Sequence, residues 1–319
     1  MLELIDSLPG IDLPVGAVSP ELSKMWEGNN KEALSEFRAS QMNLVLHFGK
    51  KVDGATARKR FEVAVRFAQR YPSRIIVLCP FVEEEQPMRA KLFSQCFIGE
   101  SHREMCCCEA LLLGFTSEDN GFLFNQVSVW LESDLPTYHW FSGVRPERIE
   151  NYRDNLLQRV NRMAFDSNIE PSIWATIDWP NPSRVTDLAK ARLLPVRQAV
   201  GQYLSGYPID LLQKDLSSIE VKFAPNRKGE AHHLLEWLGK CLGLDSEFMS
   251  QQKLTDSDAN DSSLGFKILY KDNRHITWAS QAESNTTKFE HSLLGSVKSF
   301  PIRIKPLLPE QELAEAFYF

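Results

Sequence analysis

The segment from residue 43 to residue 79 constrains the fold of this 319-residue chain more than any other. The run Asn43–Gly49 is mostly apolar without polar alternation, which is typical of a strand covered on both faces. Apolar residues then recur at helical spacing from Ala57 to Ala68, behind an Asp53 that can cap the helix. A second apolar run, Ile75–Cys79, follows. Strand, helix and strand within about 35 residues predict a βαβ unit with a right-handed crossover.

Further strands and helices alternate through the rest of the first two thirds of the chain. We expect strands at 91–98 and 104–115 that form an antiparallel extension, a helix at 121–132, a strand at 138–141, a helix at 146–162 and a strand at 163–166. Residues 185–204 have a helical pattern, in which Pro195 is placed at the first position of a fresh helix. This alternation predicts an α/β domain at residues 41–205, with a Rossmann-like mixed sheet flanked by helices.

The two ends of the chain have different patterns. Residues 1–40 contain several prolines and glycines, and we expect an N-terminal arm on the surface of the first domain. In the C-terminal part, apolar residues alternate at 219–223 as in a half-buried strand, and a helix with one apolar face follows at 231–242. A run of alternating strands and a short helix from Pro309 complete the chain. Residues 206–319 are therefore predicted to form a second, smaller α+β domain.

Composition limits the partners and the location of the protein. The chain has 36 Lys and Arg against 42 Asp and Glu, a formal net charge of −6, and a net-acidic chain is poorly suited to bind phosphate backbones. We therefore expect no nucleic-acid partner. The longest apolar runs are far shorter than the roughly 20 residues that cross a bilayer, and the first residues lack the basic start of a secretory signal. We expect no membrane partner, a cytoplasmic location, and six cysteines that are mostly thiols.

The turn after the first predicted strand lacks the common nucleotide-binding motifs. Gly49–Gly54 reads Gly-Lys-Lys-Val-Asp-Gly, which has neither the G-x-G-x-x-G spacing of a dinucleotide site nor a Walker A spacing. The G-x-S-x-G motif of a nucleophile elbow does not occur in the chain either. We therefore expect no cofactor and assign no catalytic residue.

A run of three cysteines, Cys106 to Cys108, is the most unusual local feature. On a strand, Cys107 points away from its two neighbours, so that at most two of the three can face one ion. A zinc site would need His102 or Cys96 as well, and no C-x-x-C spacing supports it, so we expect no metal. Two interpretations stay open, which are buried cysteines acting as small hydrophobic residues and a redox-sensing thiol.

Several polar residues could contact an anion or a partner. Arg74, Arg192 and Arg197 could bind a sugar phosphate through their planar guanidinium groups, although arginines beside helices are more often solvated or paired with carboxylates. Asp166 and Ser167 follow a strand, where α/β folds bind ligands, but Asp-Ser is also an ordinary helix cap.

Aromatic residues are a second set of candidates, because protein interfaces favour aromatic side chains. Trp174, Trp179 and the terminal Phe317–Phe319 could anchor a partner. They could equally cover the protein's own core, which is the interpretation we favour. Trp140 is most simply a core residue.

A series of short segments resembles the OpcA family, the glucose-6-phosphate dehydrogenase assembly proteins. The matching segments are Arg38 with Asn43-Leu-Val, Tyr71-Pro-Ser-Arg74-Ile-Ile-Val, Cys96, Cys107-Cys108-Glu109, Asp134-Leu-Pro136 with Trp140, Phe165-Asp166-Ser167, and Asp187-Leu with Ala191-Arg192-Leu193, Pro195 and Arg197. They occur in the family's order and cover residues 38–205. The chain departs from the family at Lys190, where a tryptophan is usual, and at residues 194–197, which read Leu-Pro-Val-Arg in place of Thr-Pro-Trp-Arg.

The resemblance implies a non-catalytic assembly factor or allosteric activator of glucose-6-phosphate dehydrogenase, in the oxidative pentose phosphate pathway, that binds the active oligomer. The candidate anion or partner contacts are then Arg38, Asn43, Arg74, Asp134, Trp140, Asp166, Ser167, Arg192 and Arg197. Because activity in some family members is tied to thiol oxidation, Cys96, Cys107 and Cys108 are candidate redox residues. Two alternatives remain, which are a sugar-phosphate-binding enzyme of isomerase or lactonase type, built around Arg74, Arg192 and Asp166, and a thiol-based redox sensor.

Overall fold

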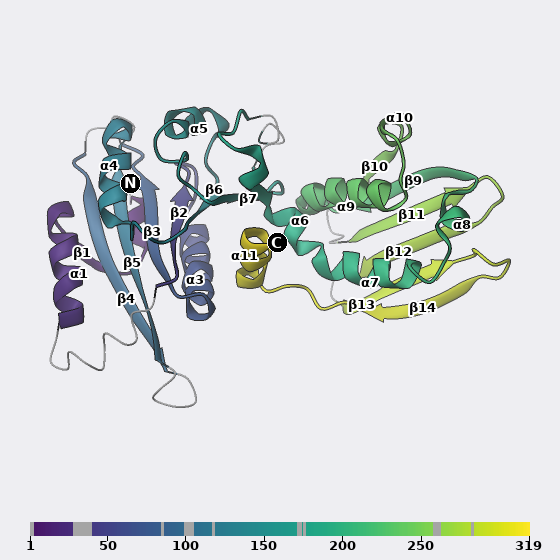
Figure 1. Ribbon diagram of the computed structural model, residues 1–319, viewed down its shortest axis with the longest axis horizontal. Helices are drawn as coiled ribbons and strands as arrows, with labels where there is room; N and C mark the ends of the chain where they lie inside the picture. Colours follow the sequence, from purple (N-terminus) through teal and green to yellow (C-terminus); the bar gives the residue numbers. More distant parts are fainter. Residues whose placement is uncertain are drawn as a thin grey trace. The chain divides into compact units, whose positions relative to one another are not determined.

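The chain folds into two compact units in the computed structural model (Figure 1). Unit 1 comprises Met1–Asp166, Glu170–Thr186 and Pro309–Phe319, and unit 2 comprises Ser167–Ile169 and Asp187–Leu308. The structure describes residues 3–27, 40–83, 86–98, 105–116, 119–170, 174, 177–257, 263–281 and 284–319.

Unit 1 is built on an eight-stranded mixed sheet with the strand order β1-β4-β5-β3-β2-β6-β7-β8. The strands are β1 (Ile11–Leu13), β2 (Met42–Phe48), β3 (Ser73–Pro80), β4 (Arg89–Ile98), β5 (Met105–Phe115), β6 (Thr137–Ser142), β7 (Arg162–Phe165) and β8 (Val185–Asp187). The run β5-β3-β2-β6-β7 is parallel, whereas β4 and β1 extend the sheet by antiparallel pairing. The predicted α/β class with a Rossmann-like mixed sheet is therefore confirmed.

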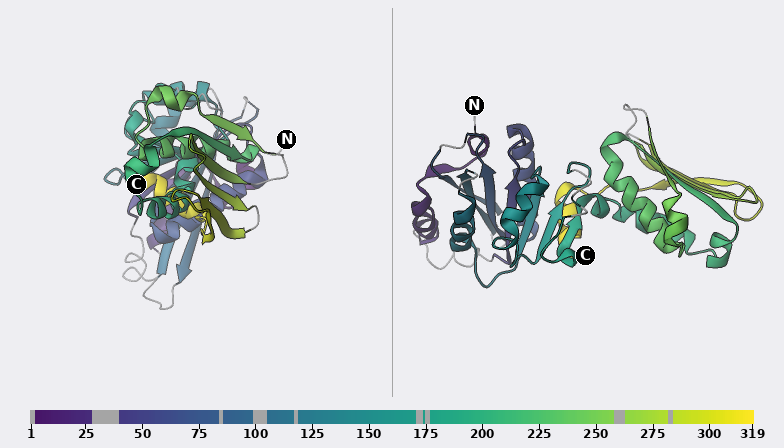
Figure 2. Two further views of the ribbon diagram at one scale, coloured as in Figure 1. Left: turned by 90° about the vertical axis from the view of Figure 1, so that its right-hand side faces the viewer. Right: turned by 90° about the horizontal axis from the view of Figure 1, so that it is seen from above.

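The chemistry of the residues explains the first βαβ unit. Every residue of β2 and β3 is buried, as expected for central strands that are covered on both faces. Helix α3 (Gly54–Arg70) follows β2. Its predicted cap is confirmed, because Oδ1 of Asp53 accepts hydrogen bonds from the N–H groups of Ala55 and Thr56 at 2.9 and 3.0 Å. Figure 2 shows α3 on one face of the sheet and α4 (Asn120–Trp130) on the other.

Helix α5 (Pro146–Arg153) is shorter than the helix predicted at 146–162. The chain continues in turns, while Leu156, Leu157 and Val160 remain buried in the core of unit 1. The apolar pattern was therefore a sound indicator of burial, but it did not distinguish a helix from a series of turns.

The first residues are part of unit 1 rather than a surface arm. Strand β1 pairs with β4, and Ile5 and Leu8 are buried. Helix α1 (Val18–Glu27) adds Val18 and Leu22 to the hydrophobic core. The predicted arm is corrected here, since apolar residues spaced between the prolines pack onto the sheet.

The last helix of the chain, α11 (Pro309–Tyr318), also belongs to unit 1, although unit 2 precedes it. The ring of Phe317 lies with its centroid 6.0 Å from that of Phe67 on α3 and 5.1 Å from that of Tyr138 on β6. Phe317 is therefore a core residue, as we favoured, whereas Phe319 is 88% exposed, so for that residue the favoured interpretation was wrong. The predicted domain at 206–319 does not include the end of the chain.

Unit 2 contains a six-stranded sheet with the strand order β10-β9-β11-β12-β13-β14. The strands are β9 (Leu216–Phe223), β10 (Lys253–Asp256), β11 (Leu264–Tyr270), β12 (His275–Gln281), β13 (Ser284–His291) and β14 (Lys298–Arg303). Strand β10 is parallel to β9, and the other pairs are antiparallel. The helices are α6 (Leu188–Arg192), α7 (Leu194–Leu204), α8 (Ile209–Gln213), α9 (Lys228–Cys241) and α10 (Ser246–Ser250). The second, smaller sheet agrees with the predicted α+β class.

The chain passes into unit 2 at Asp187, not at the predicted residue 206. Helix α7 places Val196, Val200 and Leu204 in the hydrophobic core of unit 2. A fresh helix begins here, as predicted, but it starts at Leu194, so that Pro195 is its second residue and not its first. A helix belongs to the unit in whose core its apolar face packs. The periodicity of the helix predicts that such a face exists, but it does not predict which core the face packs against.

Candidate functional site

The carboxyl ends of β2 and β6 form the switch point of the unit 1 sheet, because β3 lies on one side of β2 and β6 on the other. Ligands of α/β proteins bind in the crevice outside such a point. Here the N–H of Gly49 donates to the carbonyl oxygen of Ser142 at 2.9 Å, and a Cβ on Gly49 would lie 1.7 Å from the carbonyl oxygen of Gly143. The two loops therefore touch through their backbones where a dinucleotide-binding fold holds its cofactor.

A buried glutamate closes the same edge of the sheet. Oε1 of Glu170 accepts a hydrogen bond from the N–H of Gly143 at 2.8 Å, and Oε2 accepts one from the N–H of Asp166 at 2.8 Å. Burial raises the pKa of Glu170 to about 7, although both hydrogen bonds favour the charged form. No motif or periodicity in the sequence indicates Glu170. The predicted contact Asp166 is buried beside it and holds this loop through its backbone.

The predicted anion contact Arg74 is buried in an ion-pair network of unit 1. Its Nε donates to Oε1 of Glu109 at 2.5 Å, its Nη1 donates to the carbonyl of Trp130 at 3.1 Å, and its Nη2 pairs with Glu132. Both Arg74 and Glu109 are buried. The guanidinium group therefore joins β3, β5 and the end of α4, and it does not present a face to an external anion.

Asn43 fixes the loop that carries the predicted Asp134. Its Nδ2 donates to the carbonyls of Glu132 and Leu135 at 3.0 and 3.3 Å, and its Oδ1 accepts from the N–H of Glu132 at 2.9 Å. Asn43 is fully buried, so these bonds replace the water that its amide loses. Asp134 itself is exposed on this loop.

The tryptophans that were candidate partner contacts lie in the core of unit 1. The exposed fractions of Trp140, Trp174 and Trp179 are 1%, 0% and 6%. The guanidinium carbon of Arg60 lies 5.6 Å from the ring centroid of Trp140. The interpretation of these tryptophans as core residues is confirmed by their burial.

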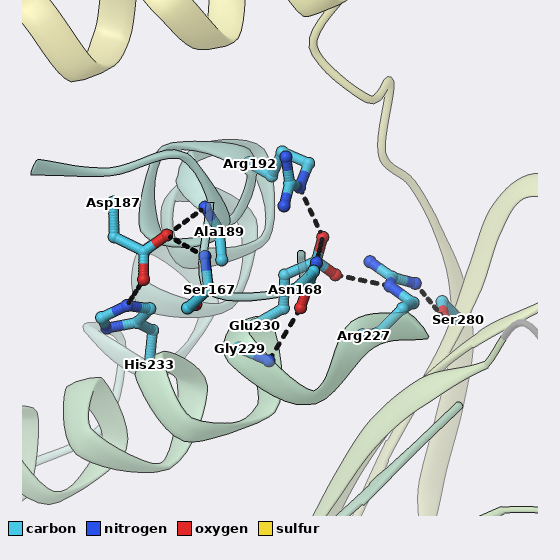
Figure 3. A network of polar contacts seen from close by, with 10 residues as sticks. All are labelled: Ser167, Asn168, Asp187, Ala189, Arg192, Arg227, Gly229, Glu230, His233 and Ser280. Carbon is cyan, nitrogen blue, oxygen red and sulfur yellow. Dashed lines mark hydrogen bonds and ion pairs between the residues drawn. The ribbon is translucent and has the colours of Figure 1, made fainter. Parts of the chain in front are cut away.

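The first polar cluster of unit 2 surrounds Asp187 (Figure 3). Oδ1 of Asp187 accepts from the N–H groups of Ser167 and Ala189 at 3.1 and 2.9 Å, and Oδ2 lies 2.7 Å from Nε2 of His233. Burial alone would raise the pKa of Asp187, but its contacts with His233 and Ser167 hold that pKa below the usual value. Asp187 is thus the cap of α6 and joins it to α9 and to the segment 167–169.

Although this cluster contains Ser, His and Asp, it is not arranged for nucleophilic catalysis. Nε2 of His233 faces Asp187, and Nδ1 lies 3.6 Å from Oε2 of Glu236. Both ring nitrogens therefore face carboxylates, whereas a catalytic triad needs one of them directed at the nucleophile.

The second cluster of unit 2 surrounds the buried Glu230 (Figure 3). Oε1 of Glu230 lies 2.7 Å from Nε of Arg192, and Oε2 lies 2.5 Å from Nε of Arg227. Asn168 reaches the same helix, because its Oδ1 accepts from the N–H of Gly229 at 2.7 Å. The predicted contact Ser167 thus belongs to the first cluster and Arg192 to the second, and each cluster ties other segments of the chain to α9.

The two remaining predicted contacts are Arg197 and Arg38. Arg197 is half-buried on α7 in unit 2. Arg38 lies outside the residues that the structure describes.

Among the described cysteines, two form a disulfide and others are buried thiols. Cys96 on β4 and Cys107 on β5 are direct register partners and form a disulfide, so these two are not the thiols that we expected. Cys79 and Cys108 are buried thiols that form no disulfide. Within the described ranges, no three His, Cys, Asp or Glu side chains are grouped to hold a metal ion.

The fold and these contacts define a two-unit α/β protein whose buried polar residues connect its own strands, helices and loops. Residues 64–178 match the family described as glucose-6-phosphate dehydrogenase subunit N-terminal domain. This match and the two relatives below confirm the resemblance to the OpcA family, and the family model covers residues 64–178 of the chain.

Two curated relatives are named as OxPP cycle protein OpcA. The protein of Synechocystis sp. is 25% identical over 186 residues, which are 56% of this chain and 39% of the relative. The protein of Synechococcus elongatus is 31% identical over 103 residues, which are 32% of this chain and 23% of the relative. The chain thus spans less than half the length of the relatives that it matches.

Among solved structures, an aldose-aldose oxidoreductase from Caulobacter crescentus is similar at 9% identity and a TM-score of 0.39, over 86% of this chain and 87% of that one. Across the described part of the chain, no helix is both long enough and apolar enough to cross a membrane.

Proposed function

We propose that this chain binds glucose-6-phosphate dehydrogenase and favours its active oligomer, as an accessory protein of the oxidative pentose phosphate pathway with no catalysis of its own. The observation that carries the proposal is the match of residues 64–178 to the N-terminal domain of a glucose-6-phosphate dehydrogenase subunit. A protein that binds the active state of an enzyme more tightly than the inactive state shifts the population toward the active one.

Contacts within unit 1, most of them inside the matched segment, support a binding role. Arg74 and Glu109 both lie in the matched segment, and they form a buried ion pair with each other. A substrate would have to break this pair to reach either group. The loops after β2 and β6 meet through Gly49 and Gly143 at the usual place of a cofactor. We therefore propose that unit 1 acts by binding a partner with its surface, and not through a reactive group.

Helix α4 is the surface that we propose for the dehydrogenase. It lies within the matched residues and carries no charged side chain. Its outer face exposes Phe122 and Val129, whose exposed fractions are 66% and 69%. A surface helix usually has charged residues on its solvent side, whereas interface cores are depleted in charge and enriched in aromatic residues. A partner that covers α4 would remove both apolar side chains from water.

The test is co-elution of the purified chain with the dehydrogenase of its own organism, with Phe122→Asp as the variant. We expect a complex with the wild type and an affinity that is about tenfold weaker or worse for the variant, because a charge would be buried at the centre of the interface. Leu294→Asp is the matched control, since Leu294 is 62% exposed but lies in unit 2. Near-UV circular dichroism verifies that both variants are folded. Equal affinity of the two variants would refute the α4 surface, and no complex with the wild type would refute the binding role.

A redox sensor is the second candidate, and the disulfide between Cys96 and Cys107 favours it. The side chain of Cys96 is exposed, so a reductant can reach it. If the chain is a sensor, reduction changes the activation of the dehydrogenase. Activation that is the same with and without reductant, and in Cys107→Ser, would exclude this candidate.

The alternative of a sugar-phosphate-binding enzyme has less support. Of its three proposed residues, Arg74 and Arg192 are each paired with buried carboxylates, and Asp166 is buried beside Glu170. Thermal-shift measurements with hexose phosphates, followed by turnover assays, test it directly.

A further inference from the structure

The outer edge of strand β4 is only partly paired. Strand β1 pairs with β4 at Ala90–Leu92 and extends no further along it, and no other described strand lies on that side. The following residues of β4, from Phe93 to Ile98, pair only with β5, in an antiparallel register. The backbone N–H and C=O groups that point outward from this stretch therefore have no partner strand among the residues that the structure describes.

This edge lacks common features that prevent another strand from pairing with it. Proteins often protect sheet edges with charged side chains, prolines or β-bulges. Residues 92–98 read Leu-Phe-Ser-Gln-Cys-Phe-Ile, without a charge or a proline, and their register with β5 is continuous. Beyond Ser94, β4 and β5 form a two-stranded ribbon, because β3 pairs with β5 only from Glu109 onward (Figure 1). A third strand would stabilise this ribbon.

The disulfide between Cys96 and Cys107 holds the ribbon in one register, since the two residues are direct partners in the pairing of β4 with β5. A partner strand loses less conformational entropy on an edge that is already ordered than on one that must become ordered during binding. The ribbon is therefore a fixed template, on which alternate residues of β4 keep to one face.

A groove lies along the same stretch of β4, on the face of the sheet that carries α3. Its lining includes Phe93, Gln95 and Phe97, which are alternate residues of β4, and Phe61 and Val65 of α3. The ring centroids of Phe61 and Phe93 lie 5.2 Å apart in an edge-to-face contact. The volume of the groove is about 610 Å³, within the range of about 300–1,000 Å³ that is typical of binding pockets.

The wall that α3 contributes to this groove is positively charged. The helix contains five arginine and lysine residues and one glutamate, although the whole chain is net acidic. Arg66 in this wall pairs with Glu62 and Glu310 at 3.9 and 3.2 Å. Nη1 of Arg58 donates to the carbonyl of Ser7 at 3.4 Å, and Arg58 forms no ion pair within the described part of the chain. An acidic partner residue would complement Arg58.

We propose that the edge of β4 at residues 93–97 and the groove beside it bind an extended, acidic segment of another protein by strand addition. The main chain of the segment pairs with β4, its alternate apolar side chains enter the groove, and a carboxylate pairs with Arg58. This surface lies on the α3 face of the sheet, whereas α4 covers the other face (Figure 2). It is therefore separate from the surface proposed for the dehydrogenase.

The probe is a phage-displayed library of random twelve-residue peptides, selected against the full chain without any dehydrogenase. We expect the enriched peptides to have apolar residues at alternate positions and a net negative charge, and the synthetic consensus peptide to bind at micromolar concentration in calorimetry. N-methylation of one alternate set of its amides should abolish binding, because those amides pair with β4, whereas methylation of the other set should not. No enrichment, a consensus with helical spacing, or equal effects of the two methylations would overturn the proposal.

Two charge reversals locate the site. Arg58→Glu should bind the consensus peptide about tenfold more weakly, because it replaces attraction with repulsion. Lys59→Glu is the matched control, since Lys59 is exposed on the same helix but does not line the groove, and its affinity should change by less than about twofold. Equal losses in the two variants would contradict the proposal.

Amide hydrogen exchange of the wild type decides the matter if Arg58→Glu fails to fold. The amides of residues 93–97 must become more protected when the peptide binds, and unchanged protection would contradict the proposal. Sedimentation of the chain alone tests the other occupant of such an edge. A dimer that excludes the peptide would assign the edge to a second copy of this chain and overturn the proposal.

Discussion

Nε of Arg74 lies 2.5 Å from Oε1 of Glu109, across the adjacent parallel strands β3 and β5. The side chains are only 7% and 3% exposed. Removing one member of a buried ion pair leaves the other charge uncompensated, which is far more costly than the loss of an exposed pair. The segment Tyr71–Val77, which resembles the OpcA family in sequence, therefore contains an arginine that forms its ion pairs and its carbonyl contact with other residues of unit 1.

Arg74→Met is expected to lower the free energy of unfolding by about 3–5 kcal/mol, because the buried Glu109 would lose this cationic partner. Arg66→Met is the matched control, since Arg66 pairs with Glu310 at 3.2 Å but its side chain is 42% exposed. The control should cost less than about 1 kcal/mol. Urea unfolding of both variants measures the difference. Similar values for the two would mean that the Arg74 pair contributes no more than a surface pair.

The contact between the loops after β2 and β6 predicts that a methyl group added at Gly49 strongly lowers the stability of the fold. Gly49→Ala would bring a Cβ into the backbone of Gly143, and neither loop can relieve this by rotating a side chain. We expect a loss of about 3 kcal/mol in the free energy of unfolding. Gly121→Ala is the control, because open space surrounds Gly121 on α4, and its stability should change by less than about 1 kcal/mol. A tolerated Gly49→Ala would show that the two loops can separate.

Glu170 predicts a pH dependence of stability. Burial raises the pKa of Glu170 in the folded protein to about 7 from an ordinary value of 4.5, so the folded state binds more protons than the unfolded state between these values. The contribution of Glu170 to the free energy of unfolding is therefore highest below pH 4.5, falls as the pH rises toward 7 and is constant at higher pH. The total change in this contribution is about 3 kcal/mol.

The measurement is the difference in unfolding free energy between wild type and Glu170→Gln at several pH values. The difference is needed because His47, whose pKa is lowered to about 3, has the opposite slope: its contribution is lost as the pH falls through 6.5 and below. Both proteins share His47, so its effect cancels. A difference that does not vary between pH 5 and 8 would contradict the raised pKa of Glu170.

The disulfide predicts which cysteines a thiol reagent modifies. In the native protein without reductant, Cys96 and Cys107 should resist alkylation and Cys241, which is exposed, should react. Cys96→Ser is expected to lower the free energy of unfolding by about 2–3 kcal/mol, as estimated for a short closed loop, and Cys241→Ser to leave it almost unchanged. Peptide mapping by mass spectrometry detects the bond, and alkylated Cys96 in the untreated protein would contradict it.

The elements of the fold were largely predictable because their patterns are local. The all-buried strands at 42–48 and 73–80 and the helix between them follow from apolar runs, a cap and spacing. The assignment of elements to units was not predictable, since it depends on contacts between distant residues. Phe317 at the end of the chain packs against Phe67, and no feature near either residue indicates the other.

The sequence indicated which polar residues could be important, but it did not indicate which side chains they contact. Arg74 and Arg192 were noted as arginines that could bind an anion or pair with a carboxylate, and the structure selects Glu109 and Glu230 as their partners. Glu170 was missed. Its properties come from burial and from the hydrogen bonds that it makes, which arise only when separate strands assemble.

The proposed association of this chain with glucose-6-phosphate dehydrogenase is tested most directly by a titration of that enzyme with the purified chain. Complex formation by sedimentation and the substrate saturation curve are followed in the same samples. We predict a complex at micromolar concentration and a saturation curve that shifts in proportion to the complex formed, with Phe122→Asp reducing both together. Sedimentation of the two proteins as separate species, with an unchanged saturation curve, would contradict it.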